Sequence, residues 1–426
     1  MSRKSVGPRG ATKVEALIAT ALAHHQAGRF DQAQALYKRI VAFEPAHPTA
    51  LANLAMLHQQ RLAFTEAERW YARALAVKRT PEILSNLSVL RRAQGDLAGA
   101  ERLLIEALAL DPGRTDTLYN LGLTRMDAGK PAEAVAPLLQ ATCAPNASPD
   151  VFANLARVYL SIGRRDEALR NGEETLRRKD QHARASFAAR GLRPLEPVAA
   201  PRFDPTRPQH NIIAFSLWGT KATYVGGAIA NAELARALYP GWTCRIYADP
   251  SVPQAALDRM RKAGAQIAMM PLADRHYGLF WRFFAADDPQ VHYFLCRDAD
   301  SRLNSQEVEA TKAWLESGKA FHVMRDAPFH MELMLAGLWG GVGGRLRGIR
   351  EWIDRFYRST EHRWIDQDFL RLEVWPRIRE EVLIHDSHHT LFGARPFPPE
   401  GRLTAPNHVG AGHLLPEKEE GGREAP

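Results

Sequence analysis

Cysteine is scarce in this sequence, and its positions exclude two kinds of small domain. Cys143, Cys244 and Cys296 form no C-x-x-C spacing, so neither a disulfide framework nor a zinc knuckle is expected. Long apolar runs are also missing: no stretch reaches about 18 consecutive apolar residues, so we expect no membrane span. No apolar run follows Met1 before Gly7, which argues against a signal peptide and favours a cytoplasmic protein.

Charge is unevenly divided along the chain. Its 426 residues predict two or three domains, at about 100–200 residues per domain. Residues 1–190 hold 27 Lys and Arg against 19 Asp and Glu, and the remainder holds 29 of each, so the net charge of +8 lies in the first part. A basic region favours an acidic partner. Aromatic residues are not interleaved with its basic clusters, so we expect no nucleic-acid binding.

The first part is built on an internal repeat of about 34 residues. Small residues recur at this period where two helices must approach closely, at Ala33, Ala67, Ala100, Ala134 and Ala168. Each unit predicts two helices joined near a glycine, such as Gly95 or Gly129. With Asn120-Leu121-Gly122 the pattern resembles the tetratricopeptide repeat, in about five units over residues 11–180. Leu62 departs from it, because a glycine is usual there.

This resemblance implies an all-α repeat solenoid, a right-handed stack of helix pairs with a concave face. Such arrays typically bind a protein or peptide partner. The alternative is a scaffold for self-association, and the sequence leaves the oligomeric state open.

Prolines separate the two parts of the chain. Residues 191–209 contain five of them, which prevent a helix and favour an extended, semi-rigid linker. The predicted organisation is therefore a repeat array at 1–190, the linker at 191–209, a second domain at 210–412 and a flexible tail at 413–426.

The second domain reads as α/β. Short apolar runs at 211–217, 242–248 and 265–270 predict strands, and residues 226–238 and 254–263 predict the helices between them. This alternation favours a parallel sheet, with ligands at the carboxyl ends of its strands. A further apolar strand from His292 runs directly into Asp298 and Asp300. If the chain turns there, both carboxylates can reach one Mg²⁺ or Mn²⁺ ion, together with phosphate oxygens of a substrate. Alone, the motif also fits a loop with Asx turns.

Several segments, in order, carry a resemblance to nucleotide-diphospho-sugar glycosyltransferases of the GT-A fold. They look similar to the glycogenin-like and mannosyltransferase-like families. The segments are Phe215–Gly219 with Tyr224, Phe280–Phe283, Arg297–Arg302, and Asp366–Leu370 with His385–Ser387. The resemblance covers about residues 210–412 and implies a GT-A-like, Rossmann-like domain.

The resemblance also implies a donor site. The nucleotide base and ribose would lie against Ser216, Trp218, Gly219 and Tyr224. Arg282 would face the diphosphate, with a salt bridge to Asp287 or Asp288 as the alternative. Arg395, in a stretch that echoes a late phosphate-binding pattern, would reach a phosphate as well.

The implied metal site joins Asp298 and Asp300 to a late histidine. His385 is favoured, His389 is second, and His388 stays open; the alternative is a polar histidine satisfied by the fold. The metal would be Mn²⁺ or Mg²⁺.

Further roles follow from the same resemblance. Arg325 and Asp326 would bind sugar hydroxyls, or form a structural ion pair. Trp339 would stack on a sugar, or lie in the core. If the reaction inverts the anomeric centre, Asp366 or Asp368 would be the base; otherwise these residues fit a helix N-cap.

Together these observations predict a metal-dependent glycosyltransferase whose repeat array recruits the acceptor. The alternative is a non-catalytic repeat adaptor with a degenerate transferase domain. A metal-dependent phosphoesterase would need more clustered His and Asp residues than this chain has. Donor sugar, acceptor and stereochemistry stay open.

Overall fold

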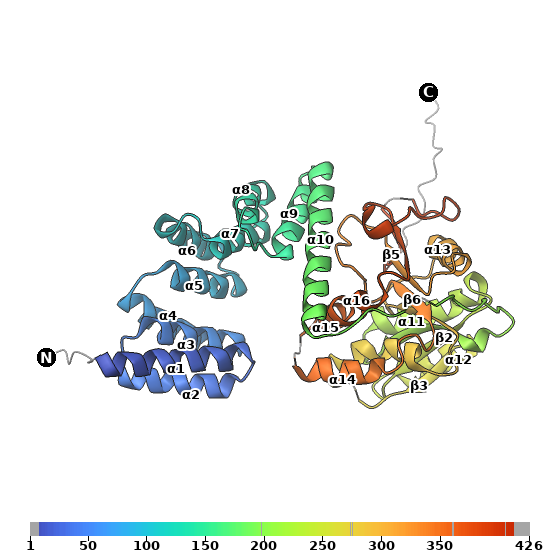
Figure 1. The fold of residues 1–426 in the computed structure, drawn as a ribbon, viewed down its shortest axis with the longest axis horizontal. Helices are drawn as coiled ribbons and strands as arrows, with labels where there is room; N and C mark the ends of the chain where they lie inside the picture. Colours follow the sequence, from blue (N-terminus) through green and yellow to red (C-terminus); the bar gives the residue numbers. More distant parts are fainter. Residues whose placement is uncertain are drawn as a thin grey trace, which may run out of the picture. The chain divides into compact units, whose positions relative to one another are not determined.

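The computed structural model describes residues 8–196, 198–272, 274, 276–359, 362–404 and 406–412. The chain forms two compact units, one ending at Ala168 and the other beginning at Leu169 (Figure 1). Across the described residues, no helix is both long and apolar enough to cross a membrane.

The first unit is a row of helix pairs, as the repeat predicts. Each helix packs against the next one along the chain, and Figure 1 shows them in colours from blue to teal. The helices are α1 (Pro8–Gln26), α2 (Phe30–Phe43), α3 (Pro48–Gln60), α4 (Phe64–Val77), α5 (Pro81–Ala93), α6 (Leu97–Leu110), α7 (Thr115–Asp127), α8 (Pro131–Thr142) and α9 (Pro149–Ser161).

The recurring alanines lie where this packing is tightest. Ala33, Ala67, Ala100 and Ala134 have no exposed surface. A larger side chain at such a position forces neighbouring helices apart. The period in the sequence is therefore a period of close helix contacts.

The turns between paired helices need a left-handed backbone. Gly28, Gly95, Gly129 and Gly163 have φ values between 71° and 84°, where glycine is favoured because it lacks a Cβ atom. Leu62 occupies the same place in the second pair, with φ at 59° and a side chain that is 75% exposed. The turn keeps its shape without glycine, at the cost of backbone strain.

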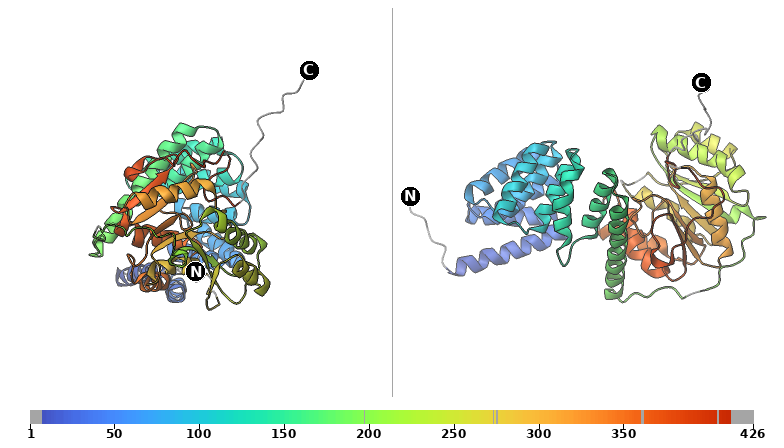
Figure 2. Two further views of the ribbon diagram at one scale, coloured as in Figure 1. Left: turned by 90° about the vertical axis from the view of Figure 1, so that its right-hand side faces the viewer. Right: turned by 90° about the horizontal axis from the view of Figure 1, so that it is seen from above.

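Helix α10 (Arg165–Ala189) completes the last pair in sequence, but most of it belongs to the second unit. Leu176 and Ala183 are buried in that unit's core. The indole Nε1 of Trp375 donates to Asp180 at 2.7 Å, and Figures 1 and 2 show α10 beside α16 (Trp375–Ile378). The contacts therefore divide the chain within the first turn of α10, between Ala168 and Leu169, rather than at residue 190. A helical period shows that one face is buried but not against which neighbour.

The proline-rich segment contains no α-helix among its described residues, as predicted, but it does not act as a free spacer. The backbone N–H of Leu195 donates to the carbonyl of Arg377 at 2.9 Å. The ring of Phe203 stacks on Trp242 with centroids 5.4 Å apart. Both anchors lie on the second unit, so the segment runs along its surface and ends in a 3₁₀ turn, η1 (Pro208–His210).

The second unit contains a seven-stranded sheet in the order β3-β2-β1-β4-β6-β5-β7. All neighbours are parallel except β6, which runs antiparallel to both β4 and β5. The strands are β1 (Asn211–Leu217), β2 (Thr243–Ala248), β3 (Gln266–Met269), β4 (Tyr293–Arg297), β5 (Phe321–Arg325), β6 (Trp339–Val342) and β7 (Val382–Asp386). Every residue of β1 and β4 is buried, as expected for central strands covered on both faces.

Helical segments cover this sheet and connect its strands. The first of them, α11, packs on β1 and β2, whereas η2 packs on β1 and β4. They are α11 (Ala222–Leu238), α12 (Gln254–Lys262), the 3₁₀ segment η2 (Tyr277–Asp287), α13 (Ser305–Glu316), α14 (Ile349–Ser359), α15 (Ile365–Phe369), the π-helical η3 (Leu370–Val374), α16 and the short 3₁₀ turn η4 (Leu391–Gly393).

Candidate functional site

A pocket of about 510 Å³ opens where β1 and β4 end. The strand order reverses between these strands, because β2 and β4 lie on opposite sides of β1. Open α/β sheets bind ligands at such a switch point. The predicted site residues that line the pocket are Ser216, Trp218, Tyr224, Arg282, Asp298, Asp300 and Asp366.

Asp298 and Asp300 line the same pocket because the chain turns directly after β4. The backbone N–H and hydroxyl of Ser301 both donate to the carbonyl of Asp298, at 3.2 and 2.8 Å. The Asp298 side chain is 47% exposed. Burial, and next the charge of Asp298, raise the pKa of Asp300. The turn thus brings together two carboxylates that repel each other, a pair that a cation would stabilise.

Two glycines allow other segments to approach this turn closely. A Cβ atom on Gly337 would lie 2.1 Å from an Asp298 carboxylate oxygen, and one on Gly227 would lie 2.0 Å from the carbonyl of Ala299. Any larger residue would displace the turn. The backbone at both positions therefore helps to fix where the carboxylates lie.

Arg282 is the central cation of the pocket. Its guanidinium donates to Asp298 at 2.5 Å and to Asp366 at 2.8 Å, and its backbone N–H donates to the hydroxyl of Ser216 at 2.9 Å. Burial opposes the charge, but Asp298 and Asp366 outweigh it and raise the pKa of Arg282. The alternative prediction, a salt bridge from Arg282 to Asp287 or Asp288, was wrong. Asp288 pairs with Arg245, and Asp287 pairs with Arg350.

Asp366 enters the pocket from the start of α15 and is only 5% exposed. Burial raises its pKa, and Arg282 only partly offsets this, while Asp298 adds to the rise. A carboxyl group with a raised pKa takes up a proton more readily near neutral pH. Asp298, Arg282 and Asp366 thus form a continuous chain of charges across the pocket.

His385 does not line this pocket. Its Nδ1 lies 2.8 Å from Nε2 of His322, inside the protein, and the pKa of His385 is lowered to about 4 by burial and then by Arg395. Strand β7 is three strands from β4, roughly 14 Å at the usual strand spacing. In the described residues, no group of three or more His, Cys, Asp and Glu side chains is close enough to hold a metal ion. The three-ligand set expected from the sequence is therefore not assembled there.

Arg325 and Asp326 also lie outside the pocket. Arg325 is fully buried and pairs with Asp386 at 2.6 Å rather than with Asp326. Asp326 accepts hydrogen bonds from the Ser387 hydroxyl and, at 2.8 Å, from the backbone N–H of Val409. These contacts tie the last strand and the chain near residue 409 to β5, so both residues connect structural elements.

The remaining predicted residues lie beside the pocket or away from it. Asp368 forms an ion pair with Arg371, and its carboxylate lies 3.1 Å from Nε2 of His362. Arg395 is exposed, and its backbone pairs in parallel with that of His385. Gly219 follows Trp218 with φ at 73° but does not line the cavity. Trp339 is a core residue, fully buried against Phe283 and Phe294.

The sequence patterns did not predict part of the pocket wall. Arg363 and Trp364 line the pocket just before Asp366, and Trp364 is 61% exposed. The guanidinium carbon of Arg363 lies 5.1 Å from the centre of the Trp364 ring. An exposed tryptophan next to an arginine, directly ahead of a motif, was the available signal.

Comparison with known proteins identifies the repeats. Residues 24–87 and 86–148 match two models of the tetratricopeptide repeat. The N-terminal part of the chain is therefore built of tetratricopeptide repeats. No curated protein sequence matches the chain.

Several solved structures are similar to part of the chain. A tetratricopeptide-repeat protein of Thermus thermophilus is 26% identical, with 41% of this chain and 97% of that one covered and a TM-score of 0.35. PilF of Pseudomonas aeruginosa is 24% identical, with 42% and 86% covered and a TM-score of 0.36. MamA is 20% identical, with 38% and 96% covered and a TM-score of 0.34.

Proposed function

We propose that the second unit is a metal-dependent glycosyltransferase. It moves a sugar from a nucleotide-sugar donor to an acceptor, and the repeat array recruits that acceptor. The observation that carries this proposal is the turn after β4, which directs Asp298 and Asp300 into a pocket at the switch point of the sheet.

The pair of carboxylates fits a hard divalent cation. Magnesium is usually held by one or two carboxylates, with water and substrate phosphates completing its shell, so a third protein ligand is not required. Burial first, and next the charge of Asp298, raise the pKa of Asp300, and a cation would relieve the repulsion between the two carboxylates. When bound, Mn²⁺ or Mg²⁺ would neutralise charge on a diphosphate.

Arg282 supports the same chemistry. It is 4% exposed, so its charge acts in a poorly solvated environment where electrostatic interactions are strong. A donor diphosphate would compete with Asp298 for its guanidinium and would be stabilised there as it becomes the leaving group.

Asp366 is the better candidate for a catalytic base. It lines the pocket, whereas Asp368 does not, and burial raises its pKa. If the reaction inverts the anomeric centre, Asp366 would accept the proton of the attacking hydroxyl. If the reaction retains the anomeric configuration, Asp366 would act only through Arg282.

A non-catalytic adaptor is the second candidate. The observation in its favour is that Arg282 already pairs with both Asp298 and Asp366, so part of the charge in the pocket is neutralised internally. Tetratricopeptide repeats imply a protein partner in either case. An adaptor would bind that partner and no nucleotide sugar.

The experiment is release of nucleotide from a panel of nucleotide sugars with Mn²⁺. We expect metal-dependent release by the full chain and loss of at least about 100-fold in rate with Asp300→Asn. Asp258→Asn, at an exposed carboxylate on α12 paired with Arg261, is the matched control and should leave the rate unchanged. No metal-dependent release from any donor, with no donor binding by calorimetry, would leave the adaptor as the function.

The recruiting role of the array has its own measurement. A bound acceptor is held near the pocket at a raised effective concentration. We therefore expect residues 169–426 alone to show a higher KM for a protein acceptor with an unchanged kcat. Equal KM values would remove recruitment from the proposal without affecting the transferase.

A further inference from the structure

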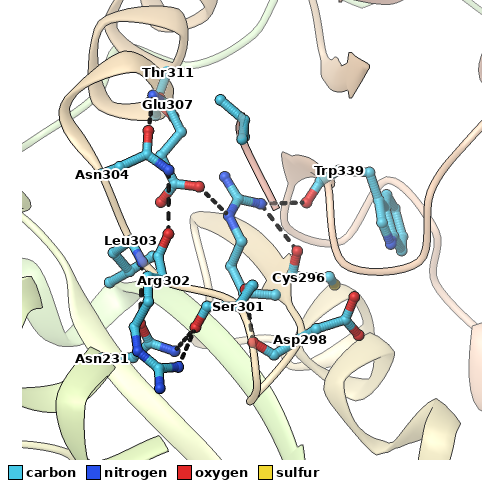
Figure 3. A network of polar contacts seen from close by, with 12 residues as sticks. Asn231, Cys296, Asp298, Ser301, Arg302, Leu303, Asn304, Glu307, Thr311 and Trp339 are labelled. Carbon is cyan, nitrogen blue, oxygen red and sulfur yellow. Dashed lines mark hydrogen bonds and ion pairs between the residues drawn. The ribbon is translucent and has the colours of Figure 1, made fainter. Parts of the chain in front are cut away.

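The turn that carries the two aspartates is held by hydrogen bonds from several side chains. The carbonyl of Asp300 accepts from Nη1 of Arg302 at 3.2 Å, and the carbonyl of Ser301 accepts from Nδ2 of Asn231 at 2.8 Å. Asn231 also accepts from the backbone N–H of Leu303 at 3.0 Å. One fully buried amide on α11 thus clamps both sides of Arg302 (Figure 3).

A buried ion pair lies behind the same turn. Arg297, the last residue of β4, has no exposed surface, and its Nε lies 3.3 Å from Oε2 of Glu307 on α13. Its Nη1 donates to the carbonyls of Cys296, at 2.9 Å, and Trp339, at 3.3 Å. Figure 3 shows Glu307 at the other side of the network from Asp298. The pair therefore joins α13, β4 and β6 at the base of the turn.

Glu307 also lies in the capped first turn of its helix. Its backbone N–H donates to the side chain of Asn304 at 3.0 Å, and the hydroxyl of Tyr239 on the loop after α11 donates to its carboxylate at 3.3 Å. The segment from Asp298 to Asn304 is consequently anchored at both ends. The carboxylates are left as the groups that face the pocket.

Stability alone does not account for such a pair. Removing two full charges from water costs free energy that their attraction often does not recover, and an apolar pair of similar size is commonly as stable. The network ends at the backbone carbonyls of Asp298 and Asp300, the two residues whose carboxylates carry the proposed chemistry. Its hydrogen bonds fix backbone atoms of the turn rather than distant ones.

We propose that Asn231, Arg297 and Glu307 are positioning residues, which hold Asp298 and Asp300 in the arrangement that takes a divalent cation. This inference rests on the proposed function. None of the three lines the pocket, so they act through the turn.

The first experiment uses the full chain with Asn231→Asp. This variant keeps the acceptor for Leu303 but places a carboxylate against the carbonyl of Ser301. We expect binding of Mn²⁺ alone, followed by electron paramagnetic resonance, to weaken about 10- to 100-fold. Amide hydrogen exchange in the metal-free protein should accelerate about tenfold or more at residues 301–303 and stay unchanged in β1.

The second experiment replaces the ion pair without leaving a lone buried charge. The double variant Arg297→Met with Glu307→Leu should keep a cooperative thermal transition. Its affinity for Mn²⁺ should fall about 10- to 100-fold, as expected for Asn231→Asp. Arg325→Met with Asp386→Leu is the matched control, because that pair is equally buried in the same sheet but does not touch the turn. The control should bind Mn²⁺ like the wild type.

The outcomes separate this inference from the proposed function. Folded variants that bind Mn²⁺ within twofold of the wild type, with unchanged exchange in the turn, overturn the positioning role and leave the proposed function standing. Equal losses in the Arg325 control overturn it as well, since the effect would then be a general one. A wild-type protein that binds no Mn²⁺, even with a nucleoside diphosphate, removes the proposed metal site and this inference with it.

Discussion

Ion pairs of the repeat array lie at its surface, whereas several in the second unit lie in the core. In the array, the side chains of Arg79 and Glu106 are 53% and 41% exposed. In the second unit, those of Arg325 and Asp386 are 0% and 1% exposed. Residues 1–168 hold 21 Lys and Arg against 16 Asp and Glu, a net charge of +5, whereas residues 169–426 hold 35 against 32, a net charge of +3.

This difference separates two uses of charge. Exposed charges are solvated, contribute little to stability and act at long range on a partner. Buried charges need an opposite charge and fixed geometry, so they constrain the backbone around them. Net charge is informative for the array, and individual pairs are informative for the second unit.

The largest effect should come from removing α10 from the second unit. Residues 191–426 lack Leu176, Ala183 and the Asp180 acceptor of Trp375. We expect a loss larger than the about 2–5 kcal/mol of one buried leucine, and no cooperative thermal transition by circular dichroism. Residues 169–426 are the comparison and should melt cooperatively. Equal melting of both fragments would mean that α10 belongs to the array alone.

Arginine removal should cost very different amounts in the two units. Arg325→Met leaves Asp386 as a buried, uncompensated charge, and we expect a loss of about 3–5 kcal/mol in the free energy of unfolding. Arg79→Met, from an exposed pair, should cost below about 1 kcal/mol. Urea unfolding of both full-length variants measures the difference. Similar losses would contradict the contrast between the units.

Acid should weaken the second unit through His385. The unfolded chain binds a proton near pH 6.5, but the folded protein does so only near the lowered pKa of about 4. This contribution is therefore fully present above pH 6.5 and is lost as pH falls towards 4, by roughly 3 kcal/mol.

A titration of stability against pH checks this. His385→Gln, which keeps a polar partner for His322, should flatten the decline between pH 6.5 and 4. His182→Gln, at an exposed position on α10, is the control. An unchanged slope in His385→Gln would show that this histidine does not carry the effect.

The smallest effect concerns the backbone of the array rather than its charges. Leu62→Gly removes strain at a positive φ and loses little packing, so we expect a gain of about 0.5–1 kcal/mol. Gly95→Ala should lose about 1 kcal/mol in the free energy of unfolding through backbone strain, because its φ is 84°. No atom lies within 4 Å of an added Cβ, so no steric clash adds to this cost. The midpoint of urea unfolding measures both. A loss with Leu62→Gly would mean that its side chain contributes contacts.

Much of the pocket was predictable because its residues follow strand ends. Ser216 and Trp218 lie at the end of β1, and Asp298 and Asp300 lie just past β4. Parallel strands bring their carboxyl ends to one edge of a sheet, so order along the chain sufficed to bring these residues together. His385 is also near a strand end, but its strand is at the far side of the sheet, which order along the chain does not reveal.

Partners of buried charges were not predictable. Arg282 pairs with Asp298 and Asp366, and Arg325 pairs with Asp386, although other carboxylates are nearer to them in sequence. These choices depend on distances of a few ångströms between elements far apart in the chain. The π-helical η3, between α15 and α16, likewise has no signal in the spacing of its residues.

By itself the sequence determined the helix pairs, their glycine turns, the α/β character of the second part and the aspartates at its strand end, because these depend on short periods and local backbone preferences. Only the tertiary structure decided that α10 packs with the second unit, that Arg282 joins two carboxylates and that His385 lies apart from them. Each of these depends on which buried faces and charges meet, and burial leaves a charge only a few available partners where solvent would give it many.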